Sequence, residues 1–219
     1  MLLVVGLIAG WRWYLGSDSA PDRQLYSYIK RNPELGALYN KAIAKEKEIA
    51  KTPDKPTLYF DAGLYWKSIA EQSSENQRPF FEKSLLIYER GIEKFGQNNI
   101  LFYLNGGKLA ERLEDYAKAE RYYKQAVKIS PADESGYLAL VDLYYYKLKL
   151  PKEDILAVFD VGMSSMINTV PLVSGRASYL RRIGEYAAAL KDYRTLSKVF
   201  PQNAGYKEII QELQSQLAK

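Results

Sequence analysis

Apolar residues recur along this chain with the three-to-four-residue spacing of helices that bury one face. The clearest stripe runs from Leu35 to Ala50 and ends at Lys51-Thr52-Pro53-Asp54-Lys55-Pro56, where two prolines break the helix. Asn32-Pro33-Glu34 predicts its start, because Asn is a favoured N-cap and Pro is tolerated at the first helical position. A second stripe predicts an amphipathic helix near the C-terminus, and its members are Tyr206, Ile209, Ile210, Leu213 and Leu217.

Between these two helices, four landmarks recur in the same order: a small residue, an aromatic residue, a second small residue and a Pro or Gly that ends a helix. The sets are Ser84, Tyr88, Gly91 and Gly96; Ala119, Tyr123, Ala126 and Pro131; less regularly Ile155, Phe159 and Gly162; and Ala189, Tyr193, Leu196 and Pro201. The second set follows the first by about 35 residues, and the last follows the second by about two such periods. A period of this size indicates an array of helical hairpins.

The stretch from Tyr103 to Pro131 resembles the tetratricopeptide repeat (TPR), a family with a fixed order of aromatic, small and proline positions. The residues in that order are Tyr103, Gly106, Gly107, Ala110, Tyr116, Ala119, Tyr123, Ala126 and Pro131. The segment from Gly184 to Tyr193 repeats the signature of the second helix. As a whole, the chain looks like a membrane-anchored bacterial TPR protein.

The resemblance implies an all-α fold, an α-solenoid of stacked helix-turn-helix hairpins with an N-terminal transmembrane helix. About four repeats are expected, at 57–96, 100–131, 134–168 and 170–201. A leading helical segment at 25–56 and a C-terminal capping helix at 203–219 are expected to cover the two ends of the array. Leu148–Pro151 departs from the family pattern, which has a tight turn there.

The alternation of small and large residues has a packing interpretation. Alanine or glycine at Ala119, Ala126, Gly162 and Ala189 lets helix backbones approach, and the aromatic rings then fill the space between hairpins. Most of the 19 tyrosines are therefore interpreted as packing residues. Paired glycines within a first helix, as in Gly106-Gly107-Lys108, are interpreted in the same way, because the other residues of a phosphate-binding loop are missing.

Charge and composition exclude several function classes. The 219 residues carry a net charge of +5, from 31 basic and 26 acidic residues, which is too modest for a general nucleic-acid-binding surface. The chain has no cysteine and no histidine, so the commonest nucleophiles, general bases and transition-metal ligands are missing. We therefore expect no enzyme activity, no catalytic, cofactor or metal site, no nucleic acid partner and no small-molecule substrate.

The N-terminus is the other informative segment. Leu2 to Gly10 is uninterrupted apolar sequence, and Trp11, Arg12, Trp13 and Tyr14 follow as residue types found at membrane interfaces. A helix over residues 1–15 would rise about 22 Å, which is less than the roughly 30 Å of a bilayer core. The favoured interpretation is part of a transmembrane anchor at 1–16, followed by a linker at 17–24. A cleaved signal peptide and a buried helix are the alternatives.

Two observations favour opposite sides of the membrane for the repeats. Arg12, Arg23, Lys30 and Arg31 follow the apolar segment and, by the positive-inside rule, favour a cytoplasmic array. Bacterial envelope repeat proteins that resemble this chain hold the array outside the cytoplasm. We expect a single-pass protein of the bacterial inner membrane with a periplasmic TPR domain, and the cytoplasmic face is the alternative.

In TPR proteins the first helix of each hairpin lines the concave surface, so the resemblance assigns a protein-binding groove to these helices. The expected groove residues are Phe60, Leu64, Leu101, Leu104, Asn105, Lys108, Arg112, Leu138, Asp142, Tyr145, Tyr146, Arg181 and Arg182. They combine an apolar and aromatic floor with a basic edge, which favours a helical or acidic segment of another protein as the occupant. The alternative is that they pack on the chain's own loops or on a neighbouring subunit.

Two functions remain open from sequence. The first is a membrane-anchored scaffold or adaptor that binds protein partners through its groove in a bacterial envelope assembly, such as a pilus, secretion, flagellar or other membrane complex. The second is an obligate structural subunit of a multiprotein membrane complex with no exchangeable ligand. Fold alone does not choose between them.

Overall fold

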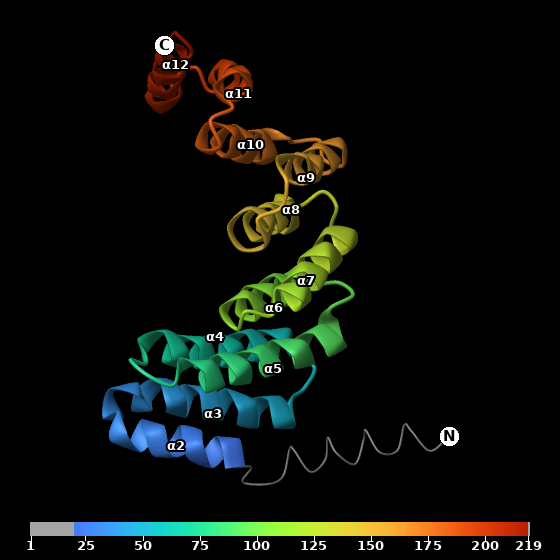
Figure 1. Ribbon diagram of the computed structural model, residues 1–219. Coiled ribbons are helices and arrows are strands. Elements are labelled where there is room, and N and C mark those ends of the chain that lie inside the picture. Colours follow the sequence, from blue (N-terminus) through green and yellow to red (C-terminus); the bar gives the residue numbers. More distant parts are fainter. Residues whose placement is uncertain (1–19, 219) are drawn as a thin grey trace. The chain divides into compact units, whose positions relative to one another are not determined.

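The computed structural model describes residues 20–218, and every regular element in this range is a helix (Figure 1). The elements are α2 (Ala20–Arg31), the 3₁₀ turn η1 (Pro33–Leu35), α3 (Gly36–Lys51), α4 (Pro56–Gln72), α5 (Gln77–Phe95), α6 (Ile100–Arg112), α7 (Tyr116–Ile129), α8 (Glu134–Asp142), the π-helical segment η2 (Leu143–Leu148), α9 (Lys152–Ser164), α10 (Val170–Arg182), α11 (Tyr186–Val199) and α12 (Ala204–Leu217). The all-α prediction is therefore confirmed for the described residues. The chain divides into two compact units, 1–93 and 94–219, with the boundary inside α5.

In the described part of the first unit, α3 and α4 pack against each other, and Trp66 of α4 lies at the centre. Its ring meets Tyr39 of α3 edge-on at 5.7 Å between centroids and stacks on Phe80 of α5 at 6.2 Å. The indole Nε1 donates a hydrogen bond to Glu46 Oε1 at 2.6 Å, which satisfies the one polar atom of a buried side chain. A single tryptophan thus holds three helices together.

Two local features of this unit differ from the sequence expectations. Helix α2 begins at Ala20, inside the stretch 17–24 expected to be a linker, because a proline in the first turn does not prevent a helix. Asn32-Pro33-Glu34 does start a helical segment, the turn η1 that leads into α3. The Asn32 side chain, however, does not cap it, because its Nδ2 donates back to the Tyr28 carbonyl oxygen at 2.8 Å.

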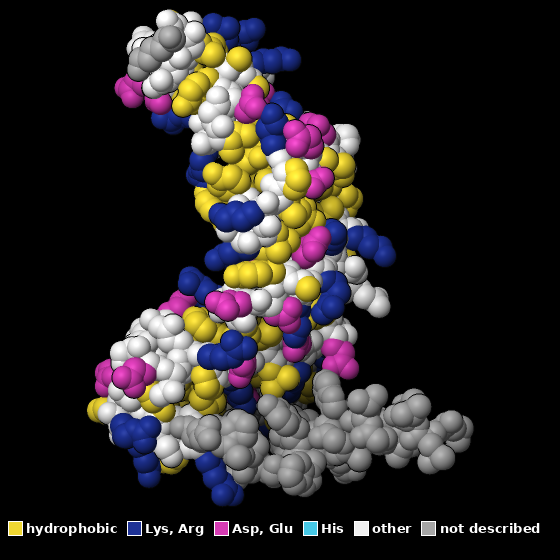
Figure 2. All heavy atoms as spheres, in the orientation of Figure 1, with side chains coloured by type: hydrophobic (Ala, Val, Ile, Leu, Met, Phe, Trp, Pro, Cys, Tyr) yellow, Lys and Arg dark blue, Asp and Glu magenta, His cyan; other side chains and the backbone are white. Residues whose placement is uncertain are grey.

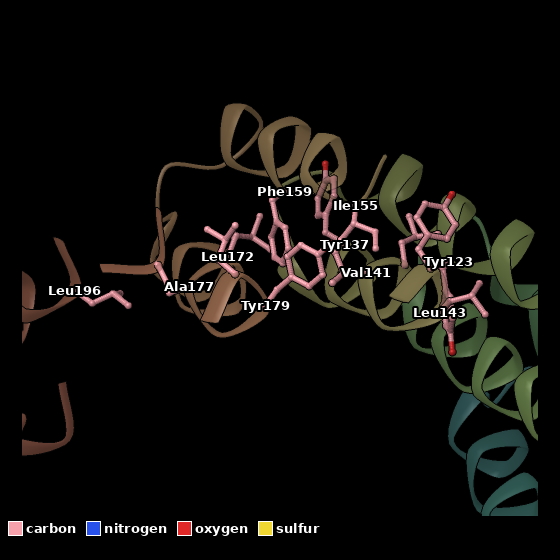
Figure 3. Packing of buried hydrophobic residues seen from close by; sticks show 14 of the residues in the cluster. Tyr123, Tyr137, Val141, Leu143, Ile155, Phe159, Leu172, Ala177, Tyr179 and Leu196 are labelled. Atoms are coloured by element: carbon pink, nitrogen blue, oxygen red, sulfur yellow. The ribbon is translucent and has the colours of Figure 1, made fainter. Parts of the chain in front are cut away.

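The second unit contains three helical hairpins and then α12. Figure 3 shows the rings of Tyr137, Phe159 and Tyr179, from α8, α9 and α10, beside the aliphatic side chains of its core. The same buried cluster extends from α6 to Leu213 of α12. Because Leu213 is fully buried, α12 covers the apolar face of the last hairpin, which a repeat array otherwise leaves open.

Small residues lie where one helix meets an aromatic ring of the next. A Cβ atom on Gly63 would come within 2.6 Å of the Tyr88 ring, and one on Gly107 within 2.3 Å of the Tyr123 ring. Neither distance leaves room for a side-chain atom. The alanines expected to allow close helix approach are also buried, and they are Ala119, Ala126 and Ala189.

A second recurrent contact joins a first helix to the turn before it. The Tyr59 hydroxyl donates to the Pro53 carbonyl oxygen in the first unit, and the Tyr137 hydroxyl donates to the Pro131 carbonyl oxygen in the second, both at 3.1 Å. Both rings are buried while their hydroxyl groups reach a backbone acceptor. The tyrosine-rich composition therefore supplies polar contacts between turns and helices as well as packing.

One guanidinium group connects three helices of the second unit. Asp192 of α11 is a buried carboxylate, and Arg176 of α10 binds it through Nε and Nη2, both at 2.8 Å. The Arg176 Nη1 also donates to Asp160 Oδ1 of α9 at 3.3 Å. This two-point geometry compensates the charge that Asp192 carries into the interior.

The predicted anchor at 1–16, with its interface residues Trp11, Arg12, Trp13 and Tyr14, lies outside the described residues. Within 20–218, no helix is both long enough and apolar enough to cross a bilayer.

The buried alanines lead to a prediction about packing. Ala119→Leu should lower the free energy of unfolding by about 1–3 kcal/mol, because the added atoms overpack the α6–α7 contact. Ala117→Leu on the exposed side of the same helix is the control, and its effect should stay within about 0.5 kcal/mol. Urea unfolding followed by circular dichroism measures both values, and equal losses in the two variants would show that overpacking at Ala119 is not the cause.

Candidate functional site

The candidate site lies on the first helices of the second unit, α6, α8 with η2, and α10. Figure 2 shows hydrophobic side chains gathered over α8, α9 and α10, with both basic and acidic side chains around them. Of the expected groove residues in the second unit, six are exposed, namely Leu101, Lys108, Arg112, Asp142, Tyr146 and Arg182, and four are partly buried, namely Asn105, Leu138, Tyr145 and Arg181.

Several expected groove residues lie elsewhere or are already engaged. Leu104 is only 8% exposed, because it belongs to the hydrophobic core of the second unit. Arg181 forms an ion pair with Glu212 of α12 at 2.6 Å, so its charge is partly neutralised within the chain. Phe60 and Leu64 belong to α4 in the first unit, where Leu64 is 50% exposed and Phe60 is partly buried. Their role in a groove stays a prediction.

A pocket of about 390 Å³ opens among the helices α6, α7 and α8 and the segment η2. Its lining consists of Lys108, Glu111, Tyr123, Ala139, Asp142, Tyr146 and Lys147. The Tyr123 hydroxyl donates to Glu111 Oε1 at 2.5 Å, and burial together with this bond raises the pKa of the Tyr123 hydroxyl well above its usual value. The phenol therefore stays protonated and holds the Glu111 carboxylate in place.

Next to the pocket, the Arg182 guanidinium rests on two tyrosine rings. Its central carbon lies 5.1 Å from the ring centroid of Tyr146 and 5.8 Å from that of Tyr145. The two rings meet edge-on at 4.8 Å, and Tyr145 also contacts Tyr179 of α10 edge-on at 5.4 Å. We call Tyr145, Tyr146 and Arg182 the aromatic–cation cluster. Its cation is held by ring faces, so its N–H groups remain available for an anion.

The electrostatic balance around the cluster is positive. Lys108, Arg112, Lys147, Lys149 and Arg182 have no carboxylate within ion-pair distance among residues 20–218. Burial raises the pKa of the Asp142 carboxyl group, and the positive charge of Arg182 opposes that shift. Because Glu111 accepts a hydrogen bond from Tyr123, fewer carboxylate oxygens than cationic groups remain in this region. An acidic ligand is favoured by this surface.

The local backbone explains why two tyrosines lie side by side here. η2 has π-helical hydrogen bonding, ends at Lys149 in the left-handed conformation, and is closed by a bond from the Leu150 N–H to the Tyr144 carbonyl oxygen at 3.0 Å. A π-helical turn accommodates extra residues in a helix and is often found at functional sites. This turn ends at Leu148, where the stretch Leu148–Pro151 that departs from the repeat pattern begins.

Sequence reasoning missed part of this site. Tyr123 was expected to be an ordinary repeat position, Glu111 was not singled out, and Ala139 carries no chemistry of its own. Lys147 lies just before the irregular stretch Leu148–Pro151 and Lys149 lies within it, and this stretch was the one available signal. Within residues 20–218, no cluster of three acidic side chains could hold a metal ion.

Solved structures share this architecture. A tetratricopeptide repeat protein from Parabacteroides merdae superposes with a TM-score of 0.59 at 16% identity, over 92% of this chain and 75% of its own. MamA from residue 41 onwards, from Desulfovibrio magneticus, gives 0.54 at 10% identity, over 86% and 99%. This chain has the tetratricopeptide repeat fold.

A third TPR structure, YrrB, is described as having an unusual peptide-binding site. It gives a TM-score of 0.51 at 17% identity, over 80% of this chain and 84% of its own. No protein-family model matches the sequence, and no curated protein matches it. The TPR assignment therefore rests on the fold and on the small and aromatic landmarks of the sequence.

The pocket depends on a contact that can be tested. Gly107→Ala should lower the free energy of unfolding by about 1–3 kcal/mol, because its Cβ meets the buried Tyr123 ring, which the bond to Glu111 holds in place. Gly36→Ala is the control, because nothing lies within 4 Å of its Cβ and alanine favours a helix. It should stabilise by about 0.5–1 kcal/mol. Thermal unfolding of both variants measures these changes in stability. An unchanged stability of Gly107→Ala would contradict the close contact between Gly107 and the Tyr123 ring.

Proposed function

We propose that this TPR chain is a scaffold that binds another protein at the aromatic–cation cluster and the adjoining pocket of its second unit. The observation that carries the proposal is the Arg182 guanidinium, positioned by two tyrosine rings beside an open pocket. Aromatic and arginine side chains are the residues that most often dominate binding energy at protein interfaces. TPR folds generally serve as protein-interaction scaffolds, which is consistent with this role.

The occupant that fits is a helical or extended segment with acidic residues. A pocket with Ala139 and Tyr146 in its wall accepts one apolar side chain, and the surrounding Lys108, Lys147 and Arg182 attract carboxylates. The description of YrrB as a peptide-binding TPR protein supports a peptide as the ligand class. Arg181 is excluded from the contact while Glu212 holds it.

The setting we propose is a bacterial envelope assembly, with residues 1–16 as a membrane anchor and the repeats on the periplasmic side. The apolar run and the interface residues from Trp11 to Tyr14 support it. An obligate structural subunit is the second candidate, because the second unit also exposes the apolar side chains of Val161 on α9 and Ile167 in the loop after it. Permanent interfaces are more apolar than exchangeable ones.

Peptide selection tests binding at the aromatic–cation cluster and the adjoining pocket. A phage-displayed peptide library selected on the full chain should return sequences with an apolar residue flanked by Asp or Glu, and fluorescence anisotropy then gives their affinity. Tyr146→Ala should weaken binding about tenfold or more, because an aromatic anchor is lost. Arg182→Gln should weaken it and flatten its salt dependence, because a charge contact is lost.

Arg194→Gln is the matched control, since Arg194 is an exposed arginine on α11, a second helix. It should bind the selected peptides like the unaltered chain. If all three variants bind equally while their circular dichroism is unchanged, the binding site lies elsewhere. Failure of the library to yield any binder would favour the structural-subunit candidate.

Membrane attachment is tested separately. The full chain should remain in the membrane pellet after sodium carbonate washing, because a transmembrane helix is not removed by high pH. A chain that starts at Ser17 keeps all of α2 and should appear in the supernatant. Release of the full chain by salt alone would contradict the anchor and leave the peptide-binding proposal unaffected.

A further inference from the structure

A second pocket, of about 380 Å³, lies in the first unit between α2 and the start of α5. Its lining is Arg23, Leu25, Ser27, Tyr28 and Arg31 from α2 and Asn76, Pro79 and Phe80 from α5 and the turn before it. The floor is apolar and ordered, because Leu25, Tyr28 and Phe80 are buried and the Tyr28 and Phe80 rings meet at 5.6 Å. Polar side chains, Ser27 and Asn76 among them, stand at its edge.

Two guanidinium groups at this pocket have no ion-pair partner among the side chains that the structure describes. They belong to Arg23 and Arg31, which are both exposed. Two other cations of the unit do have such partners: Arg78 binds Glu82 at 2.9 Å, and Lys45 binds Glu48 at 3.1 Å. Among the side chains that the structure describes, the pocket therefore carries two positive charges that no carboxylate neutralises.

The spacing of these groups suits a phosphate. Arg23, Ser27 and Arg31 are four residues apart, so they lie along one side of α2 over about 12 Å. Guanidinium groups bind phosphate oxygens with two parallel N–H bonds, and a serine hydroxyl between them adds a third donor. A phosphate joined to an apolar body would match both the rim and the floor.

We propose that this pocket binds the phosphodiester headgroup of an anionic phospholipid. Charge complementarity favours an anion, and the apolar floor favours one that carries glycerol and acyl carbons. Trp11, Trp13 and Tyr14 lie fewer than ten residues before α2 in sequence, and their types favour the headgroup level of a bilayer. The inference rests on the membrane attachment proposed above and is independent of the peptide site.

The absence of cysteine allows a direct test with the full chain. Ser74 is exposed in the turn beside Asn76, so Ser74→Cys can carry an environment-sensitive fluorophore next to the pocket. The labelled chain is mixed with vesicles of phosphatidylcholine containing increasing fractions of phosphatidylglycerol. We expect a blue shift that grows with the anionic fraction and is minimal in pure phosphatidylcholine.

Charge variants separate the site from general attraction. Arg23→Gln with Arg31→Gln should raise the phosphatidylglycerol fraction needed for half of the shift by about threefold or more, because each basic residue near an anionic surface strengthens binding. Lys47→Gln with Lys51→Gln removes the same charge from exposed positions of α3 and should leave the curve unchanged. If both pairs shift the curve equally, attraction is general and the proposal is wrong.

A third variant tests the pocket itself. Ser27→Phe keeps both arginines but fills the space between them, so it should also abolish the anionic preference, and circular dichroism checks that α2 remains folded. An unchanged preference would overturn the pocket as the binding place.

Competition with glycerol phosphate distinguishes a lipid ligand from a soluble one. If millimolar glycerol phosphate removes the fluorescence shift from vesicle-bound chains, a soluble phosphate ester rather than the lipid is the ligand. Vesicle binding with no dependence on phosphatidylglycerol refutes the headgroup site while leaving the anchor intact.

Discussion

Neighbouring helices of this chain pack closely because an aromatic ring of one helix lies against a glycine or alanine of the other. The Tyr123 ring occupies the space that a Cβ atom on Gly107 would need. The backbones of α6 and α7 are therefore separated there only by the ring. The buried ring has a polar tip, and the tip must find an acceptor. Tyr123 finds Glu111, which is how a packing contact also builds the wall of a surface pocket.

The same rule limits where binding chemistry can arise. Regular hairpins bury their tyrosine rings between helices, as Tyr123 and Tyr193 show. The segment of α8 and η2 spans 134–148, longer than the 13 residues of α6 or α10, and the additional residues are taken up by π-helical hydrogen bonding. Tyr145 and Tyr146 are thereby placed outside the core, against Arg182. An irregularity in the repeat thus supplies the aromatic surface that regular packing does not.

How much of this follows from sequence depends on the range of the interaction involved. The recurring small and aromatic positions reveal the hairpins, because a packing rule repeated at a fixed period leaves a pattern in one dimension. The prediction that Leu104 lines an open groove was wrong, since its burial depends on how several helices pack together in the core. The pocket around Glu111 and Lys147 was missed for a related reason: its lining comes from three helices and a π-helical turn, whose geometry no local pattern encodes.

The ion pair between Arg181 and Glu212 has a consequence for how the end of the chain works. Glu212 acts as an internal competitor: it occupies the guanidinium that an acidic ligand would otherwise use. While α12 is docked, helix α10 displays one arginine without an ion-pair partner, Arg182, and undocking would display two neighbouring ones. The terminal helix α12 therefore determines how many arginines of α10 can contact an acidic ligand, and it also covers the apolar face with Leu213.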